Sequence, residues 1–442
     1  MQRITTHPKL GRVLSLAVAT ILVLIPFHAL FTTWIGSNSG NLDLLRIWKE
    51  ILTVALIPAA VLLAYRSAHI RRWLLTSWTV RLIGLYVVLN LVLGAWALIH
   101  KQVNSEALIY ALLINLRFVG FFIICAVIAS SDSFLKQYWP KILLIPAMVV
   151  IIFGLSQQFL LPYDFLRHFG YGAHTIPAYQ TVDANLDYRR IQSTLRGANP
   201  LGAYLILILP AMAIVLSRWR VLRIGGLIAG AITLFYSYSR SAYIGTGLAF
   251  GALAGWLPKN SLWPRRKALI VALGVVVAVV GLYSLRYNQT TQDTLLHTSN
   301  NSTSSLSSNE ARVVAIKSGA NDVLNQPFGR GPGTAGPASF RNDHPARIAE
   351  NYYLQIGQEV GVLGILIFLG INFLIARRLW FQRSTSLSKI LLASLVGLTF
   401  VNLLSHAWTD DTLAYLWWGL AGIALSTGIL EVKNKQNDRK TH

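Results

Sequence analysis

The chain has 442 residues, of which 54% are hydrophobic and 13% are charged, whereas soluble domains carry about 25% charged residues. Its mean hydropathy is +0.51, and its single cysteine excludes an internal disulfide. This composition excludes a soluble globular protein and predicts a polytopic membrane protein. The net charge of +22 could indicate a nucleic-acid partner, and the positions of the basic residues test that interpretation.

Twelve apolar runs are long enough to cross a bilayer, which takes about 20 apolar residues per helix. We expect spans near 13–34, 48–65, 81–99, 107–130, 142–161, 201–217, 223–238, 241–257, 268–286, 352–376, 389–408 and 412–431. The first run lacks a small-residue cleavage site, so we interpret it as a retained helix and not a cleaved signal peptide. The predicted fold class is an all-α polytopic integral membrane protein, with residues 1–442 forming a single membrane domain.

The basic residues gather on one side of this predicted layout. With the N-terminus in the cytoplasm, the cytoplasmic segments carry 24 of the 39 Lys and Arg but only 3 of the 17 Asp and Glu. These segments are 1–12, 66–81, 131–141, 218–223, 258–267, 377–389 and the tail after 430. The positive-inside rule therefore accounts for the charge. We expect both termini to be cytoplasmic and expect no nucleic-acid partner.

Two long loops fall on the predicted outer side, at 162–200 and 287–350. The second begins with a Ser-, Thr- and Asn-rich tract, so we expect its first half to be partly flexible. "EARVVAIKSGANDVL" then predicts an amphipathic helix with Val313, Ile316 and Val323 on its apolar face. "NQPFGRGPGTAG" follows as a Pro/Gly turn region. There is no sequence repeat and no matched pair of interrupted helices of the kind found in transporters.

Arginines on the outer side are candidate ligands for an anionic substrate. "YSYSRSAYIG" places Arg240 in a tight turn at the membrane interface, where its guanidinium can bind phosphate in a bidentate manner. Ser239 and Ser241 could add hydroxyl donors. The alternative for Arg240 is an arginine that only extends its side chain to the interface.

A second arginine group precedes the sixth span, in "DYRRIQSTLRGANPLGAYL". It comprises Arg189, Arg190 and Arg196. The alternative is an ordinary basic loop neutralised by Asp183 and Asp187.

Two ionisable residues fall inside predicted spans. Arg117 lies mid-span, where a charge costs roughly 2.5–3.5 kcal/mol, so it needs a cavity, a carboxylate or backbone carbonyls. Both a structural and a functional role for it are open. We expect Glu359, one turn into the tenth span, to pack against a polar partner rather than to do chemistry.

Candidate bases on the outer side are His344, Glu350 and the acidic pair Asp410–Asp411 with His406. The acidic pair could bind a divalent cation, but we favour a cap on the final helix. The alternative for Glu350 is an acid at a helix N-terminus, where the helix dipole favours it.

Three stretches together resemble the O-antigen ligase and polymerase superfamily. They are "RRIQSTLRGANPLGAYL", "YSYSRSAYIG" and "QPFGRGPGTAG…ENYYLQIGQEVGVLG". The resemblance covers the whole chain in layout, and about 190–245 and 312–365 in motif. It implies a membrane fold related to the GT-C-type glycosyltransferases, with about 12 transmembrane helices and a large outer loop between helices nine and ten.

The resemblance implies a glycosyltransferase that moves a glycan from a polyprenyl diphosphate carrier to an acceptor hydroxyl on a glycan or lipid. It would work at the outer face of the cytoplasmic (inner) membrane, among membrane lipids, without a metal or other cofactor. Arg240 matches the family's Ser-Arg motif, and either Arg190 or Arg196 matches the arginine of the first motif. These arginines would contact the diphosphate, with Ser239 in support.

The third motif departs from the ligase pattern, which reads His-Asn-x-Tyr/Phe-Leu. This chain reads "ENYYL", so Glu350 stands in place of the histidine that serves as the proposed base. His344 is the second candidate, provided that the loop folds back. Asn351 and Arg312 are possible supports. An ordinary Glu titrates near about 4.3, so Glu350 would be a weak base at neutral pH unless apolar burial raised its pKa.

A transporter or flippase of a lipid-linked sugar is the alternative function. Twelve spans and outer arginines suit it as well. The short inner loops and the concentration of polar residues on the outer face argue against it, because a transporter needs access from both sides.

Overall fold

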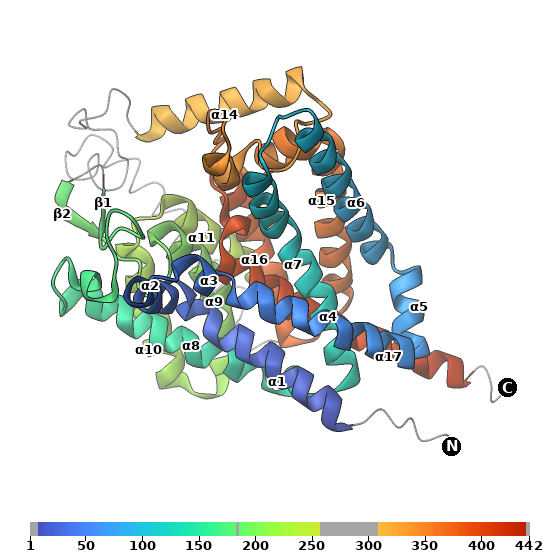
Figure 1. Cartoon of the computed structure of the whole chain (residues 1–442). Helices are drawn as coiled ribbons and strands as arrows, with labels where there is room; N and C mark the ends of the chain where they lie inside the picture. Colours follow the sequence, from blue (N-terminus) through green and yellow to red (C-terminus); the bar gives the residue numbers. More distant parts are fainter. Residues whose placement is uncertain (1–7, 183–184, 257–307, 439–442) are drawn as a thin grey trace.

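A computed structural model describes residues 8–182, 185–256 and 308–438, and these are almost entirely helical (Figure 1). The long helices are α1 (Pro8–Leu24), α2 (His28–Ser39), α4 (Trp48–Arg66), α6 (Trp78–Ile99), α7 (Ser105–Ser131), α8 (Phe134–Phe159), α9 (Ala198–Val215), α10 (Arg220–Tyr236), α11 (Arg240–Gly255), α14 (Ser308–Asn325), α15 (Tyr352–Phe381), α16 (Ser386–Asn402) and α17 (Asp411–Asp438). The short elements are η1 (Ile25–Phe27), α3 (Leu42–Arg46), α5 (Ala68–Thr76), η2 (Phe165–Phe169), β1 (Gln180–Val182), β2 (Asn185–Arg190), η3 (Leu216–Arg218), η5 (Gly336–Arg341) and η6 (Ala407–Thr409).

Eight helical segments in the described ranges are long and apolar enough to cross a membrane. They are Lys9–Ser39, Trp48–Arg66, Trp78–Ile99, Ser105–Ser131, Phe134–Phe159, Ala198–Arg218, Tyr352–Phe381 and Asp411–Ile429. The polytopic membrane prediction is therefore confirmed. Helices also form at the predicted seventh, eighth and eleventh spans, but α10, α11 and α16 have only 16 or 17 residues. The predicted ninth span and the loop up to residue 307 lie outside the described residues, so the number twelve stays a prediction.

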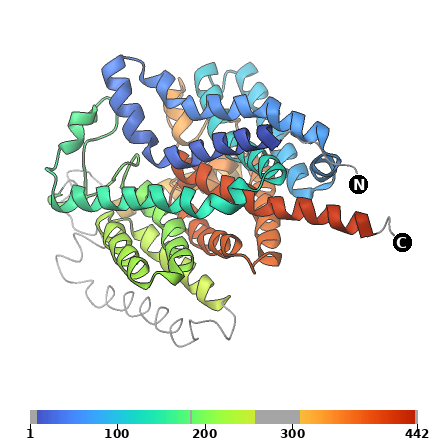
Figure 2. The same cartoon turned by 90° about the horizontal axis from the view of Figure 1, so that it is seen from below.

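The final helix packs at the centre of the bundle. Nearly all of its first nineteen residues are buried, and Figures 1 and 2 show it running beside α7. Trp418 packs its ring against Phe118 of α7, with 4.8 Å between the ring centroids, and against Trp408 and Trp417. This aromatic core holds together the two helices that carry Arg117 and Asp411, two of the ionic groups described below.

The outer loops of the prediction lie away from the two termini. Figure 1 shows α14 across the top of the bundle and the β1–β2 hairpin at its left, whereas both termini lie at the lower right. The hairpin pairs Gln180 with Arg190 and Thr181 with Arg189. An all-α prediction did not include this hairpin, because two strands of 3 and 6 residues leave little periodic signal.

Candidate functional site

Arg190 joins the first two motifs. Its Nε donates a hydrogen bond to the carbonyl of Ser237, 47 residues along the chain, at 3.0 Å. Its Nη2 donates to Asn199 Oδ1 at 2.6 Å, and the next residue, Ile191, donates its N–H to the Tyr236 carbonyl at 3.0 Å. The end of β2 is thereby attached to the turn between α10 and α11, which leads directly into Arg240.

A glycine lets the two motifs pack this closely. A Cβ at Gly202, in the first turns of α9, would lie 2.7 Å from Ala242 Cβ and 2.8 Å from Ser239 Cβ. Real Cβ atoms do not approach each other so closely. The glycine of "NPLGAYL" is therefore required where α9 touches the Ser239–Arg240 turn.

The turn itself has an unusual backbone. Tyr238 has a φ of 48°, in the left-handed region that non-glycine residues rarely adopt. Such strained residues cluster at functional sites, where surrounding contacts hold them. The Tyr238 ring packs against Tyr188 and Tyr236, and Tyr243 lies near the charges of both Arg190 and Arg240. Two cationic side chains from separate motifs thus share one outer turn.

The other two arginines of the first motif, Arg189 and Arg196, have different surroundings. Arg189 is buried, and its two Nη atoms donate to the carbonyls of Leu161, Pro162 and Tyr163 at 3.0–3.1 Å, so among the described residues backbone oxygens hold its guanidinium. Arg196 is exposed, and its charge acts on Asp410 in the loop before α17. Arg190 is therefore the arginine of this motif that is bonded to the α10–α11 turn, and which of Arg190 and Arg196 matches the family arginine stays a prediction.

Glu350 lies just before α15, not in its first turn. Asn351 is the N-cap, and its Oδ1 accepts hydrogen bonds from the N–H groups of Tyr353 (2.9 Å) and Leu354 (3.0 Å). Glu350 thus precedes the N-cap directly, at the N-terminal end of α15 as its alternative interpretation assumed, but outside the first helical turn. Glu350 instead has a φ of 50°, its side chain is 39% exposed, and Arg312 Nε of α14 lies 4.0 Å from its Oε2.

Asn351 also fixes where this segment sits. Its Nδ2 donates to the carbonyl of Leu403 at 3.0 Å, so the start of α15 is attached to the loop between α16 and α17. That loop also contains Asp410. Glu350 is thereby held beside the α16–α17 loop, on the predicted outer side.

His344 is attached to a different part of the outer side. Its Nε2 lies 3.0 Å from the Lys101 carbonyl, and Asn342 donates its Nδ2–H to the Gln102 carbonyl at 3.0 Å, both in the turn between α6 and α7. Glu350 contacts α14 instead. The two candidate bases therefore have separate supports, and which of them acts stays a prediction.

The tenth predicted span is interrupted, which the sequence interpretation did not foresee. Gly361 has a φ of 74° and interrupts α15. The Pro/Gly turn region 325–336, called the glycine-rich segment below, packs against this interruption. Its backbone bonds satisfy the freed groups: Val362 N–H donates to the Pro327 carbonyl and Gly331 N–H to the Glu359 carbonyl, each at 2.8 Å. Non-helical backbone at membrane depth is tolerated where protein satisfies it in this way.

Glu359 has the structural role that we expected. It is buried, Asn115 Nδ2 of α7 donates to its Oε2 at 2.8 Å, and Gly333 N–H donates to its Oε1 at 2.8 Å. Glu359 thus holds the glycine-rich segment against α7.

The helix predicted in the outer loop is confirmed as α14, although its predicted apolar face is only partly buried, and it is fastened to the third motif. Arg347 Nε and Gln358 Nε2 donate to Asp322 Oδ2 at 3.1 and 2.7 Å. Burial opposes ionisation of Asp322, but these hydrogen bonds and the arginine charge lower its pKa below the ordinary value. Val323 is buried as predicted, whereas Val313 is 50% exposed.

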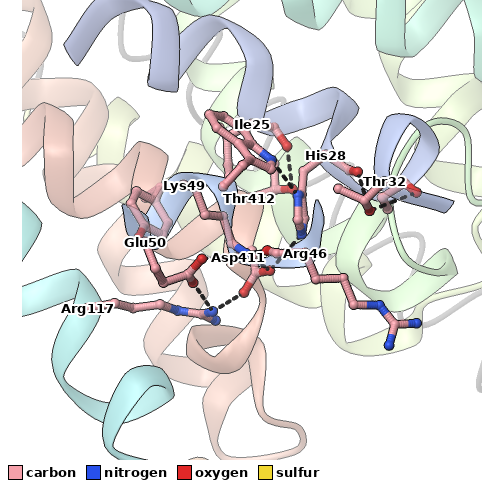
Figure 3. A network of polar contacts seen from close by, with 12 residues as sticks. Ile25, His28, Thr32, Arg46, Lys49, Glu50, Arg117, Asp411 and Thr412 are labelled. Atoms are coloured by element: carbon pink, nitrogen blue, oxygen red, sulfur yellow. Dashed lines mark hydrogen bonds and ion pairs between the residues drawn. The ribbon is translucent and has the colours of Figure 1, made fainter. Parts of the chain in front are cut away.

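Arg117 belongs to a buried ionic network, and Figure 3 shows it with Lys49, Glu50, His28 and Asp411. Its guanidinium pairs with Asp411, with Glu50 at 3.3 Å, and with the Thr409 carbonyl at 2.7 Å. Lys49 Nζ lies 3.0 Å from both Glu50 Oε2 and Asp411 Oδ2. The expectation that Arg117 needs a carboxylate or backbone carbonyls is confirmed, since it has both.

The network is electrically balanced. His28 Nδ1 accepts a hydrogen bond from Trp48 Nε1 at 3.0 Å, and indole is only a donor, so this nitrogen carries no proton. His28 is therefore neutral and donates its Nε2–H to Asp411 at 3.1 Å. Two cations, Lys49 and Arg117, then face two carboxylates. Such a closed set ties the first turns of α4 and α17 to the middle of α7 and indicates a structural role for Arg117.

Asp410 and Asp411 have different structural roles. Asp410 Oδ1 accepts from the Leu413 N–H at 3.1 Å, which confirms the predicted cap on the final helix. Burial and the adjacent Asp411 raise the pKa of Asp410 to about 6. Asp411 instead serves the ionic network. Sequence interpretation missed Lys49, Glu50 and His28 as its partners, although ionisable residues at the edge of an apolar run were a usable signal.

Comparison with known families gives a match over the region that contains these motifs. The family described as O-antigen ligase matches residues 224–369, which include the Ser239–Arg240 turn, the glycine-rich segment and the interrupted helix. Residues 224–369 carry an O-antigen ligase domain. The resemblance to the O-antigen ligase and polymerase superfamily is thereby confirmed. No curated protein matches the chain.

The O-antigen ligase domain supports ligase- or polymerase-like enzyme activity in an integral membrane protein. The first motif, with Arg190, lies outside the matched residues but is bonded to them through Ser237. The domain also holds Glu350 and both helices of the Arg240 turn.

Proposed function

We propose that this protein transfers a glycan from a polyprenyl diphosphate carrier to an acceptor hydroxyl at the outer face of the cytoplasmic membrane. The observation that carries the proposal is the bond from Arg190 to the Ser237 carbonyl, which brings the arginines of two motifs to one turn. A diphosphate carries several negative charges, so two arginines held at one turn match it in charge, and guanidinium groups can bind its oxygens in a bidentate manner.

The arginines would act on the leaving group. The acceptor oxygen attacks the anomeric carbon while the bond from that carbon to the diphosphate oxygen breaks, so negative charge grows on the diphosphate. Contacts from Arg240 and Arg190 strengthen as this charge grows, which lowers the barrier. Two arginines do here what a divalent cation does in other phosphate chemistry, so the proposed transfer is metal-independent.

Glu350 would take the proton of the acceptor hydroxyl. Its carboxylate is partly exposed on the outer side, and Asn351 fixes the backbone beside it through the bond to Leu403. The nearby Arg312 orients the carboxylate. His344 is the second candidate for the same step, and in that case Glu350 would orient the acceptor sugar.

The test is transfer by the purified protein in detergent, with a polyprenyl-diphosphate-linked glycan and an acceptor. Product formed without two compartments is expected for an enzyme and contradicts a transporter. R240A should lower the rate by about 10²–10³, the usual effect of removing one donor to a developing oxyanion. R167A is the matched control, because Arg167 is an exposed arginine of the predicted outer side whose one ion pair among the described residues is with Asp164, at 3.3 Å.

R240K separates charge from geometry, since lysine keeps the charge but not the bidentate fork. Thermal unfolding of each variant shows that it is folded. Wild-type turnover in folded R240A would refute the diphosphate contact, and loss of product on addition of a chelator would refute metal independence.

A further inference from the structure

The side of the protein that holds both termini has many arginines and few acids to neutralise them. Segments 51–105 and 360–409 contain no Asp or Glu, and they form most of α4 and α15 and all of α5, α6 and α16. The basic residues that they place toward the termini are Arg66, Arg71, Arg72, Arg81, Arg377, Arg378, Arg383 and Lys389. Figure 1 shows α5, in blue, near the two termini.

Arg378 is the member that the fold partly encloses. Its guanidinium is half-buried at the end of α15, and its Nη2 reaches Ser77 Oγ, in the turn between α5 and α6, at 3.5 Å. Within the described ranges, no carboxylate forms an ion pair with Arg378. Its neighbour Arg377 adds a second positive charge and lies over the Phe381 ring at 5.4 Å. A partly desolvated cation beside a like charge is unfavourable unless an anion binds there.

The surroundings have the character of a membrane interface. Trp78 is 66% exposed with Arg81 5.1 Å over its ring, and Phe381 is 70% exposed. Exposed aromatic rings beside arginines are typical of the headgroup level of a bilayer. α5 is a short helix outside the candidate spans that buries Ile70 and Trp73 and exposes its arginines, as an interfacial helix does.

We propose that the α5–α6 turn and the end of α15 bind the headgroup phosphate of an anionic phospholipid, with Arg378 and Arg377 as its ligands. Guanidinium groups bind phosphate oxygens in a bidentate manner, and basic pockets between transmembrane helices bind such headgroups. A lipid fits better than free phosphate, because its acyl chains would cover the exposed rings of Trp78 and Phe381. This proposal is independent of the transfer reaction on the opposite side.

The test measures thermal unfolding of the full chain in neutral detergent with added phosphatidylglycerol, phosphatidylcholine or inorganic phosphate. A ligand that binds only the folded state raises the unfolding temperature. We expect phosphatidylglycerol to stabilise the wild type and the other two additions to have little effect. R377Q/R378Q should lose most of the stabilisation, and R377Q, which changes only an exposed side chain, should lose part of it.

R220Q/R223Q on α10 is the matched control. It removes the same charge from the same predicted side, and like the test pair it changes one exposed and one half-buried arginine. We expect it to keep the stabilisation by phosphatidylglycerol and to retain the lipid in native mass spectrometry. Equal losses in both double variants, an undiminished effect in R377Q/R378Q, or equal stabilisation by inorganic phosphate would each overturn the proposal.

Discussion

Replacing Gly202 with alanine should displace the turn that carries Arg240. Carbon atoms in contact lie about 3.5–4.0 Å apart, so a Cβ that would lie 2.7 Å from Ala242 Cβ creates an overlap of about 1 Å. The atoms it meets, Ala242 Cβ and Ser239 Cβ, are fixed to the backbone and cannot rotate away. α9 and the turn must therefore separate, at a stability cost of about 1–3 kcal/mol.

The displacement should matter more for activity than for folding. A misplacement of about 1 Å near a reacting group can lower a rate about 100-fold. We expect G202A to insert in the membrane, to unfold at a lower temperature and to transfer glycan about 100-fold more slowly. G251A is the control, because Gly251 lies on α11 and a Cβ there meets nothing within 4 Å. Unchanged turnover and unfolding temperature in G202A would refute the close packing on which the site rests.

Three further predictions follow from other contacts. E350Q should keep the fold but lose transfer, and full turnover at neutral pH would remove Glu350 from the role of base. D411N leaves Lys49 and Arg117 with Glu50 as their one remaining carboxylate in the network. Denaturant unfolding should therefore show a free energy of unfolding lower by about 3–5 kcal/mol. A loss below about 1 kcal/mol, which is typical of exposed ion pairs, would contradict the network. The lowered pKa of Asp322 means that the folded state favours its carboxylate, so the stabilisation is complete above the ordinary pKa of 3.8 and disappears as the pH falls through the lower folded value. The difference in unfolding temperature between wild type and D322N should therefore be constant near neutral pH and shrink in acid; a difference that persists unchanged in strong acid would refute the assignment.

Long periodic elements were predictable, and local breaks in them were not. The apolar runs located α4, α6, α7, α8 and α9 because a helix in lipid must be apolar along its whole length. The break at Gly361 was missed, because a glycine within an apolar run has the same composition as an unbroken helix. Only the approach of Pro327 and Gly331, 30 or more residues earlier, satisfies the backbone there.

The sequence alone determined that this is a polytopic membrane protein. It also located the charged residues within apolar runs and the motifs that resemble those of the O-antigen ligases. These properties depend on composition and order, which the chain carries in one dimension. Tertiary structure decided that Arg190 and not Arg196 meets the Arg240 turn, that Arg117 is neutralised by Glu50 and Asp411, and that Asn351 caps α15 while Glu350 stays partly exposed. Each of these depends on contacts between helices far apart in the chain, because only packing determines which charges lie within reach of one another.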